Sequence, residues 1–255
     1  MLRFGLTPLK GGAHSHPDSM VVSADGPVGD RRFALVEDYR SRGYSVVRTV
    51  ENPAVLRVRP RLADDGTLSL DLPGESFVVA PDADPDPAVV ADYWGRATRL
   101  HPLPGPWDQA LSDLLGHPVR LARAEDSVVY AEPVTLVTTS SLAELARRAG
   151  VPSMDDERFR ATVVVDTGDA RPFVEDSWIG RCLRLGEVEV EVRSPVVRCA
   201  VTRLVPGTGD RADDDPVRLL APDRRMGGGV VFAVGAVVHR PGTVRVGDDV
   251  GSVPG

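Results

Sequence analysis

The sequence predicts an α+β protein that is rich in β-strands and biased toward a barrel architecture. Short runs in which apolar and polar residues alternate recur along the chain, as in residues 55–59 and 67–72, and Gly and Pro separate them. Helical patterns are few by comparison. The clearest covers residues 107–115, WDQALSDLL, and is followed by Gly116 and Pro118, which end a helix.

The composition limits the classes of function. With 255 residues, the chain can form one large domain or two smaller ones, and its 42% hydrophobic and 26% charged residues are typical of a globular protein. Aromatic residues make up 5%, so the core must consist mainly of Val, Leu and Ala. The net charge of −7 argues against general binding of nucleic acid or a membrane surface. The N-terminus lacks a signal-peptide pattern, and no apolar run is long enough for a membrane helix, so we expect a cytoplasmic protein.

A first strand is predicted over residues 2–9, and Lys10-Gly11-Gly12 follows it. The glycines permit close approach of the backbone to a ligand and leave Lys10 at the edge of the loop. His14 and His16 come next with a two-residue spacing. Because the sequence places no third ligand, exposed loop histidines are favoured over a metal site.

The predicted strands continue through the first half of the chain. Residues 55–59 alternate apolar and basic side chains and are predicted to form a half-buried strand. Asp64-Asp65-Gly66 predicts a turn into a strand at 67–72, and the Pro- and Asp-rich residues 81–87 predict a loop.

A second helix is predicted after the strand at 135–139. Ser141 is followed three residues later by Glu144, just before a helical pattern, which is a capping box. The same helix N-terminus, with Ser140 and Ser141, could instead bind an anion through its free N–H groups. The residues alone leave both interpretations open.

The chemically most distinctive stretch covers residues 172–203 and ends near Arg198-Cys199. A strand with alternating Val and Glu at 188–192 leads to this pair. A neighbouring guanidinium favours the thiolate form of Cys199, which can attack sulfur or bind a soft metal. The alternative is a buried strand cysteine that acts as a small hydrophobe. Cys182 is the only other cysteine, so no disulfide framework can form.

A basic, glycine-rich loop at residues 224–229 precedes a predicted strand at 230–234. It is similar to a phosphate cradle but lacks both glycine-loop fingerprints, so the motif is weak.

Several short motifs occur in a characteristic order. They are Pro8-Leu9-Lys10, Gly29-Asp30-Arg31-Arg32, Arg48 with Glu51-Asn52-Pro53, Glu175-Asp176-Ser177-Trp178-Ile179-Gly180, Leu185-Gly186-Glu187, Arg198-Cys199 and residues 241–248, PGTVRVGD. In this order they resemble a MOSC-domain protein that carries the MOSC N-terminal β-barrel domain, the two-domain form found in amidoxime-reducing proteins and bacterial relatives. The resemblance covers essentially the whole chain.

This resemblance implies a MOSC-type β-barrel preceded by a β-barrel-like domain, with domains at 1–90 and 91–255 and a cofactor pocket between them. The implied cofactor is the molybdenum cofactor, a pterin with a dithiolene and a terminal phosphate. The implied cofactor-binding residues are Lys10, Arg31, Arg48, Ser140, Ser141, Arg160, Thr162 and Arg198.

The chain departs from the family pattern in three places. Gly11 stands where relatives carry serine, and Arg160-Ala161-Thr162 stands where relatives often read Arg-Pro-Asn. The interval 200–247, from which relatives supply a cysteine ligand to molybdenum, contains no cysteine. Cys199 is therefore the candidate catalytic residue and the candidate metal ligand. A hard oxygen ligand, or a protein that does not use molybdenum in this way, remains an alternative.

The leading hypothesis is a molybdenum-cofactor-binding oxidoreductase that reduces N-hydroxylated or N-oxygenated small molecules. The alternatives are a sulfur carrier that uses a Cys199 persulfide and a metal-free biosynthetic enzyme that reuses the pocket. The expected partners are a small-molecule substrate and an electron-transfer protein, with no nucleic acid and no membrane.

Overall fold

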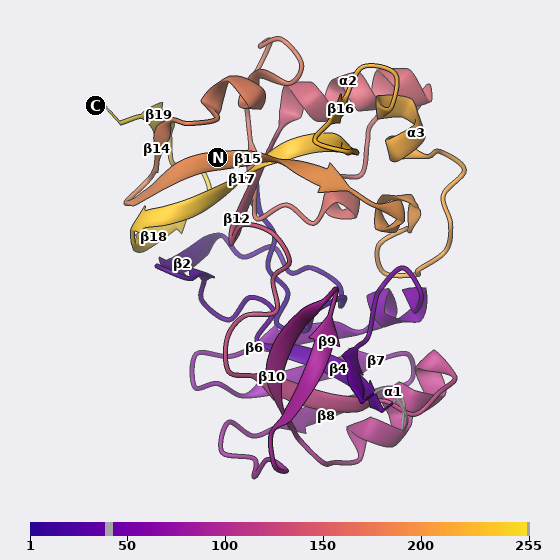
Figure 1. The fold of residues 1–255 in the computed structure, drawn as a ribbon. Coiled ribbons are helices and arrows are strands. Elements are labelled where there is room, and N and C mark those ends of the chain that lie inside the picture. Colours follow the sequence, from indigo (N-terminus) through magenta and orange to yellow (C-terminus); the bar gives the residue numbers. More distant parts are fainter. Residues whose placement is uncertain (39–42, 254–255) are drawn as a thin grey trace.

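The computed structural model describes residues 1–38 and 43–253, and it confirms the predicted strand-rich α+β class. The largest sheet has eight strands (Figure 1). Its order is β1 (Arg3–Phe4), β13 (Val163–Val165), β12 (Val134–Thr138), β17 (Gly229–Arg240), β15 (Val188–Arg198), β14 (Cys182–Leu185) and β19 (Val250–Ser252), with β16 (Arg225–Met226) paired to β17.

A closed five-stranded barrel forms the second body of the fold, and indigo to magenta segments mark it in Figure 1. Its order is β10 (Arg96–Pro102), β11 (Arg120–Ala124), β4 (Phe33–Asp38), β5 (Tyr44–Val46) and β9 (Val89–Tyr93). Two three-stranded sheets complete the strands. They are β18 (Gly242–Arg245), β2 (Ser19–Ser23) and β3 (Gly26–Pro27), and β6 (Arg59–Leu62), β7 (Leu68–Leu72) and β8 (Glu75–Val79).

The helices are short and connect or cover these sheets. They are α1 (Trp107–Leu115), α2 (Thr139–Ala149) and α3 (Pro216–Leu220), with 3-10 turns η1 (Pro53–Arg57), η2 (Asp156–Phe159), η3 (Val174–Trp178) and η4 (Ala200–Arg203). The predicted helix at 107–115 is confirmed, and Gly116 ends it in the left-handed conformation with φ 79°. No helix among the described residues is long and apolar enough to cross a membrane.

Two local predictions are corrected. Residues 55–59 do not form a strand, because Pro53 begins the turn η1, which buries Val55 and Leu56, and the strand starts only at Arg59. Ser141 is not a helix cap. The N-cap of α2 is Thr138, whose hydroxyl accepts a hydrogen bond from the Ser141 N–H at 3.3 Å.

Glu144 does not complete a capping box. Its carboxylate accepts hydrogen bonds from Arg147 and Arg148 further along the helix, at 2.7 and 2.8 Å. The pairs at i,i+3 and i,i+4 therefore hold this side chain away from the helix start.

The core is built from aliphatic side chains, as the scarcity of aromatics predicts. One cluster takes residues from all five strands of the barrel, and a second packs β4 and β11 against α1 and β7. Separate clusters cover the two faces of the large sheet. Aromatic packing is prominent on the face that α2 covers, where Phe159 and Phe232 lie with ring centres 4.5 Å apart.

The N-terminal residues join the two bodies. Strand β1 pairs with β13, and β2 pairs with β18, so the first strands of the chain belong to the C-terminal sheets. The chain then enters the barrel at Phe33, whose partner in an isolated bridge is Leu9. Lys10 is thereby held where the barrel meets the large sheet. The predicted domain boundary at residue 90 lies inside β9, and this division stays a prediction.

Candidate functional site

Lys10 is the only lysine in the sequence, and it is 9% exposed. Its ammonium donates to the Val47 carbonyl and lies 5.0 Å from the centre of the Tyr93 ring. Burial, together with the positive charges of Arg160, Arg31 and others nearby, lowers its pKa from 10.5 to about 7. A neighbouring anion would restore the charged form.

Arg160 lies beside the same loop. It adopts a left-handed backbone conformation with φ 50°, and its Nη2 donates to the Gly12 carbonyl at 3.0 Å. Burial and the charge of Arg31 lower the pKa of this guanidinium to about 9. The buried surroundings therefore disfavour the charged form of the Arg160 side chain.

Arg31 and Arg48 form ion pairs with carboxylates of the protein, and these pairs balance part of their positive charge. Arg31 has φ 48° and forms an ion pair with Asp30, whose carboxylate also accepts from the Thr7 N–H at 3.0 Å. Arg48 is shared between Glu51 at 3.3 Å and Asp92 at 3.4 Å. We call Lys10, Arg31, Arg48 and Arg160 the basic cluster.

Arg198 and Cys199 lie at the end of β15. Arg198 donates to the carbonyls of Phe232 at 2.7 Å and Phe159 at 2.8 Å, while its Nη2 is shielded from solvent and has no partner. Burial lowers its pKa to about 10, and the charge of Cys199 opposes that change. Cys199 is exposed and precedes η4, so the alternative of a buried core cysteine is wrong.

Three cations of this region have no carboxylate partner among the described residues: Lys10, Arg160 and Arg198. Elsewhere in the described structure, buried arginines have one. Arg158 pairs with Asp214 at 2.8 Å, and Arg224 donates to Asp176 at 2.9 Å. Unpaired buried charge is costly, so the unpaired set fits a bound anion such as a phosphate.

The residues fit the anionic part of the implied cofactor better than its metal. Among the described residues, no group of three or more His, Cys, Asp and Glu side chains could hold a metal ion. Cys199 is the one predicted site residue with a soft donor atom. The structure also explains the absence of serine at position 11: Gly11 has φ +90°, and a Cβ there would lie 2.8 Å from Thr49 Oγ1.

The predicted binding residues Ser140, Ser141 and Thr162 have other partners. Ser141 donates to the buried carboxylate of Glu175 at 2.7 Å, as does Thr138, the cap of α2. Ser140 accepts from the Thr167 hydroxyl at 3.0 Å, and Thr162 accepts from the Thr135 N–H at 3.0 Å. No hydrogen bond in the described part of the chain joins these hydroxyls to the basic cluster.

The basic, glycine-rich residues 224–229 form a hairpin between β16 and β17 rather than a phosphate cradle. Arg224 binds Asp176 and lies 4.1 Å from the centre of the Phe173 ring. Its charge is therefore satisfied within the protein.

Tyr93 was missed as a site residue, and the expectation of an exposed His14 is wrong. Tyr93 covers Lys10 from the end of β9, and burial raises the pKa of its hydroxyl. His14 is half-buried rather than exposed, and neither ring nitrogen has a partner. Burial, followed by the charges of Arg160 and Arg31, lowers its pKa well below the usual value. The sequence Tyr93-Trp94-Gly95 was the only available signal for Tyr93.

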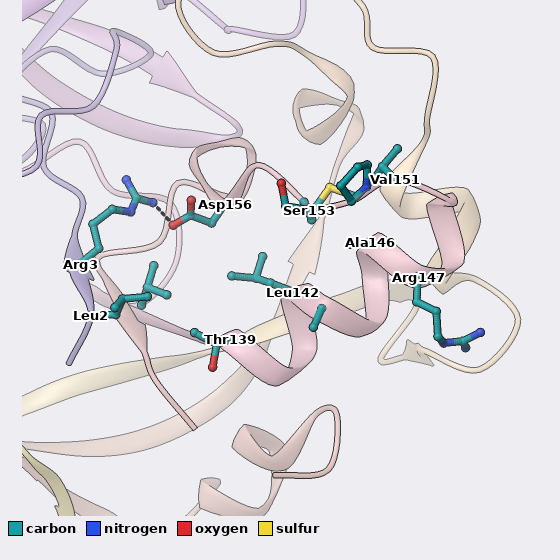
Figure 2. A pocket seen from close by; sticks show the side chains of 13 residues that line it. Leu2, Arg3, Thr139, Leu142, Ala146, Arg147, Val151, Ser153 and Asp156 are labelled. Carbon is teal, nitrogen blue, oxygen red and sulfur yellow. Dashed lines mark hydrogen bonds and ion pairs between the residues drawn. The ribbon is translucent and has the colours of Figure 1, made fainter. Parts of the chain in front are cut away.

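Two cavities have linings that include none of the three unpaired cations. One, of about 590 Å³, runs along α2 between Leu142, Val151 and the Arg3–Asp156 ion pair, and Figure 2 shows its mainly aliphatic lining. The other, of about 390 Å³, is bordered by His14, His16 and Glu157. The first contains none of the predicted site residues.

Comparison with known proteins gives a family and curated relatives. A family model described as MOSC domain matches residues 115–251. Human mitochondrial amidoxime-reducing component 1 is 29% identical over 140 residues, which cover 51% of this chain and 40% of the human protein. The protein of the same name from Danio rerio is 30% identical over 132 residues, 49% of this chain and 39% of that protein. The match thus spans less than half of either relative.

Solved structures give weaker similarity. The YUAD protein from Bacillus subtilis has a TM-score of 0.43 and 12% identity, covering 97% of this chain and 91% of its own. YiiM from Geobacillus stearothermophilus has a TM-score of 0.36 and 14% identity, covering 48% of this chain and 55% of its own.

Proposed function

Because the chain belongs to the MOSC-domain family, we propose that it binds the molybdenum cofactor and reduces N-hydroxylated or N-oxygenated small molecules. The observation that carries this proposal is the set of unpaired cations, Lys10, Arg160 and Arg198, beside the exposed thiol of Cys199. The name of the human and Danio rerio relatives, amidoxime-reducing component, supports the choice of substrate class.

In this proposal, the protein contributes binding and electrostatics. When bound, the cofactor supplies two-electron redox chemistry. Lys10 and Arg160 hold the anionic end of the cofactor, and its charge returns Lys10 to the ammonium form. The Nη2 of Arg198, which has no partner among the described residues, would donate a hydrogen bond to the bound cofactor, and Cys199 would offer its sulfur from the adjacent position.

A second candidate function is supported by the exposure of Cys199. The thiol stands outside the core, and residues 200–247 contain no other cysteine that could act on the same ligand. A persulfide on Cys199 would pass its outer sulfur to an acceptor and leave the Cys199 thiolate behind, with the guanidinium of Arg198 nearby.

Activity assays separate the two functions. Protein from a host that makes the molybdenum cofactor should reduce benzamidoxime to benzamidine with a chemical electron donor, and protein from tungstate-grown cells should not. Loss of all reduction in the molybdenum-grown protein would reject the first function. A persulfide detected on Cys199 by mass spectrometry, and absent from Cys199→Ser, would support the second. The electron-transfer partner protein is part of the first proposal.

A further inference from the structure

Two aromatic side chains lie on the surface beside the basic cluster. Trp94 is 45% exposed and Tyr130 is 56% exposed. Their ring centres are 6.3 Å apart, at an interplanar angle of 67°. In a sequence with 5% aromatic residues, neither ring contributes to the core. We call Trp94 and Tyr130 the stacking surface.

Arginine side chains lie over both rings. The guanidinium of Arg48 is 4.3 Å from the Trp94 centre, and that of Arg96 is 4.7 Å from the Tyr130 centre. Arg96 also donates to the Tyr130 carbonyl, which fixes its position. These contacts order the rings and add hydrogen-bond donors at their edges.

The backbone at Trp94 is unfavourable for its side chain. Trp94 and Gly95 are the two central residues of the hairpin between β9 and β10, with φ 56° and 82°. A two-residue turn with positive φ at both positions strongly prefers Asn-Gly or Asp-Gly. The bulky ring of Trp94 at the first position goes against this preference. The geometry of the turn therefore does not explain why a tryptophan stands there.

The stacking surface continues into the site. The Tyr93 ring is 6.2 Å from Tyr130 and 5.0 Å from the ammonium of Lys10. Arg48, which covers Trp94, is also one of the charges that act on Lys10. A planar ligand on the surface would thus have its far end directed to the basic cluster.

We propose that Trp94 and Tyr130 bind the planar, conjugated part of the substrate, so that this enzyme prefers aromatic over saturated N-oxygenated compounds. The inference rests on the proposed reduction and names its substrate class. Because the two rings are inclined by 67°, a flat ligand that stacks on one ring meets the other edge to face, whereas a puckered ring of the same size makes fewer contacts. The net charge of −7 disfavours the alternative occupant with the same stacking chemistry, a single-stranded nucleic acid.

The test compares benzamidoxime with cyclohexanecarboxamidoxime, which has a saturated ring. Trp94→Asn and Tyr130→Ala should each raise KM for benzamidoxime about two- to tenfold, leave KM for the cyclohexane compound unchanged, and leave kcat nearly unchanged. Val90→Ala is the matched control, because it removes a 60% exposed apolar side chain from the same hairpin. Equal KM effects on both compounds, an unchanged ratio in both variants, or a shifted ratio in the control would overturn the inference.

A binding measurement separates this inference from the proposed function. Benzamidoxime titrated into the wild-type protein without an electron donor should quench tryptophan fluorescence, and Trp94→Asn should lose that quenching while Val90→Ala keeps it. If neither compound is reduced but the quenching depends on Trp94, the stacking surface stands and the reductase function fails. Quenching that is the same in wild type and Trp94→Asn would reject the stacking surface.

Discussion

The ammonium of Lys10 lies 5.0 Å from the centre of the Tyr93 ring, where an ordinary buried lysine would have a carboxylate. The ring attracts the cation through its quadrupole but does not neutralise it. Arg160 is similarly without a carboxylate partner, and burial together with the nearby positive charges lowers the pKa of Lys10 to about 7. The site thus has positive charge that an anion can compensate.

The titration of Lys10 can be observed directly, because the sequence contains no other lysine. In protein labelled with ¹³C,¹⁵N-lysine, the single side-chain signal should titrate with a midpoint near pH 7. Inorganic phosphate should move the midpoint upward, since an anion favours the ammonium form. A midpoint near 10.5 without phosphate would contradict the described environment.

Glu175 should make the unfolding free energy depend on pH. Burial raises its pKa above 4.5, so the folded state holds this proton more tightly than the unfolded chain. The stabilisation is full below pH 4.5 and is lost as the pH rises through the folded-state pKa. In urea unfolding, Glu175→Gln should therefore gain stability relative to wild type between pH 4 and pH 8. Parallel curves for the two proteins would contradict this.

The Arg158–Asp214 ion pair should be important for stability. The Arg158 side chain is 6% exposed, and Asp214 accepts two hydrogen bonds from its Nη1, at 2.9 and 2.8 Å. Asp214→Asn leaves a buried guanidinium without its charge partner and should cost about 3 kcal/mol. Asp71→Asn, in an ion pair whose arginine is 66% exposed, is the control and should cost less than about 1 kcal/mol. Similar losses of unfolding free energy in Asp214→Asn and Asp71→Asn would contradict this prediction.

A substitution in the hairpin at Trp94 should leave the stability unchanged or raise it, unlike the loss expected for Asp214→Asn. Trp94→Asn creates Asn-Gly at two positions with φ 56° and 82°, which is the preferred pair for such a turn. We expect an unchanged or higher melting temperature, with a gain of up to about 1 kcal/mol in unfolding free energy. Thermal unfolding with Val90→Ala as reference measures it. A clear loss of stability would show that the ring supports the fold.

Local periodicity was sufficient for much of the fold. The alternation at 67–72 and the helical pattern of 107–115 depend on neighbouring residues alone, and both elements formed. Residues 55–59 alternate just as clearly, yet Pro53 and the burial of Val55 favour a 3-10 turn. The same physical limit applies to the cap of α2, because Thr138, Ser140 and Ser141 are chemically equivalent candidates until the strand end is known.

The site was less accessible to sequence reasoning. Lys10 and Arg198 were singled out from the local sequence, and Arg31 and Arg160 were implied by the family resemblance. Which of them lack a carboxylate partner is settled only by the fold. Tyr93 reaches Lys10 only because β9 and β5 close the barrel with parallel pairing, a contact between residues far apart in sequence. Short sequence patterns contain no signal for such closure.

Cofactor content tests the central claim most directly. Full-length protein, purified from a host that makes the molybdenum cofactor, should contain about one molybdenum and one pterin per chain, by mass spectrometry and pterin fluorescence. Lys10→Met and Arg160→Met should lose most of both, whereas Arg61→Met, which removes an exposed arginine of β6, should retain them. Absence of molybdenum and pterin from the wild-type protein, or equal retention in all three variants, would contradict the account.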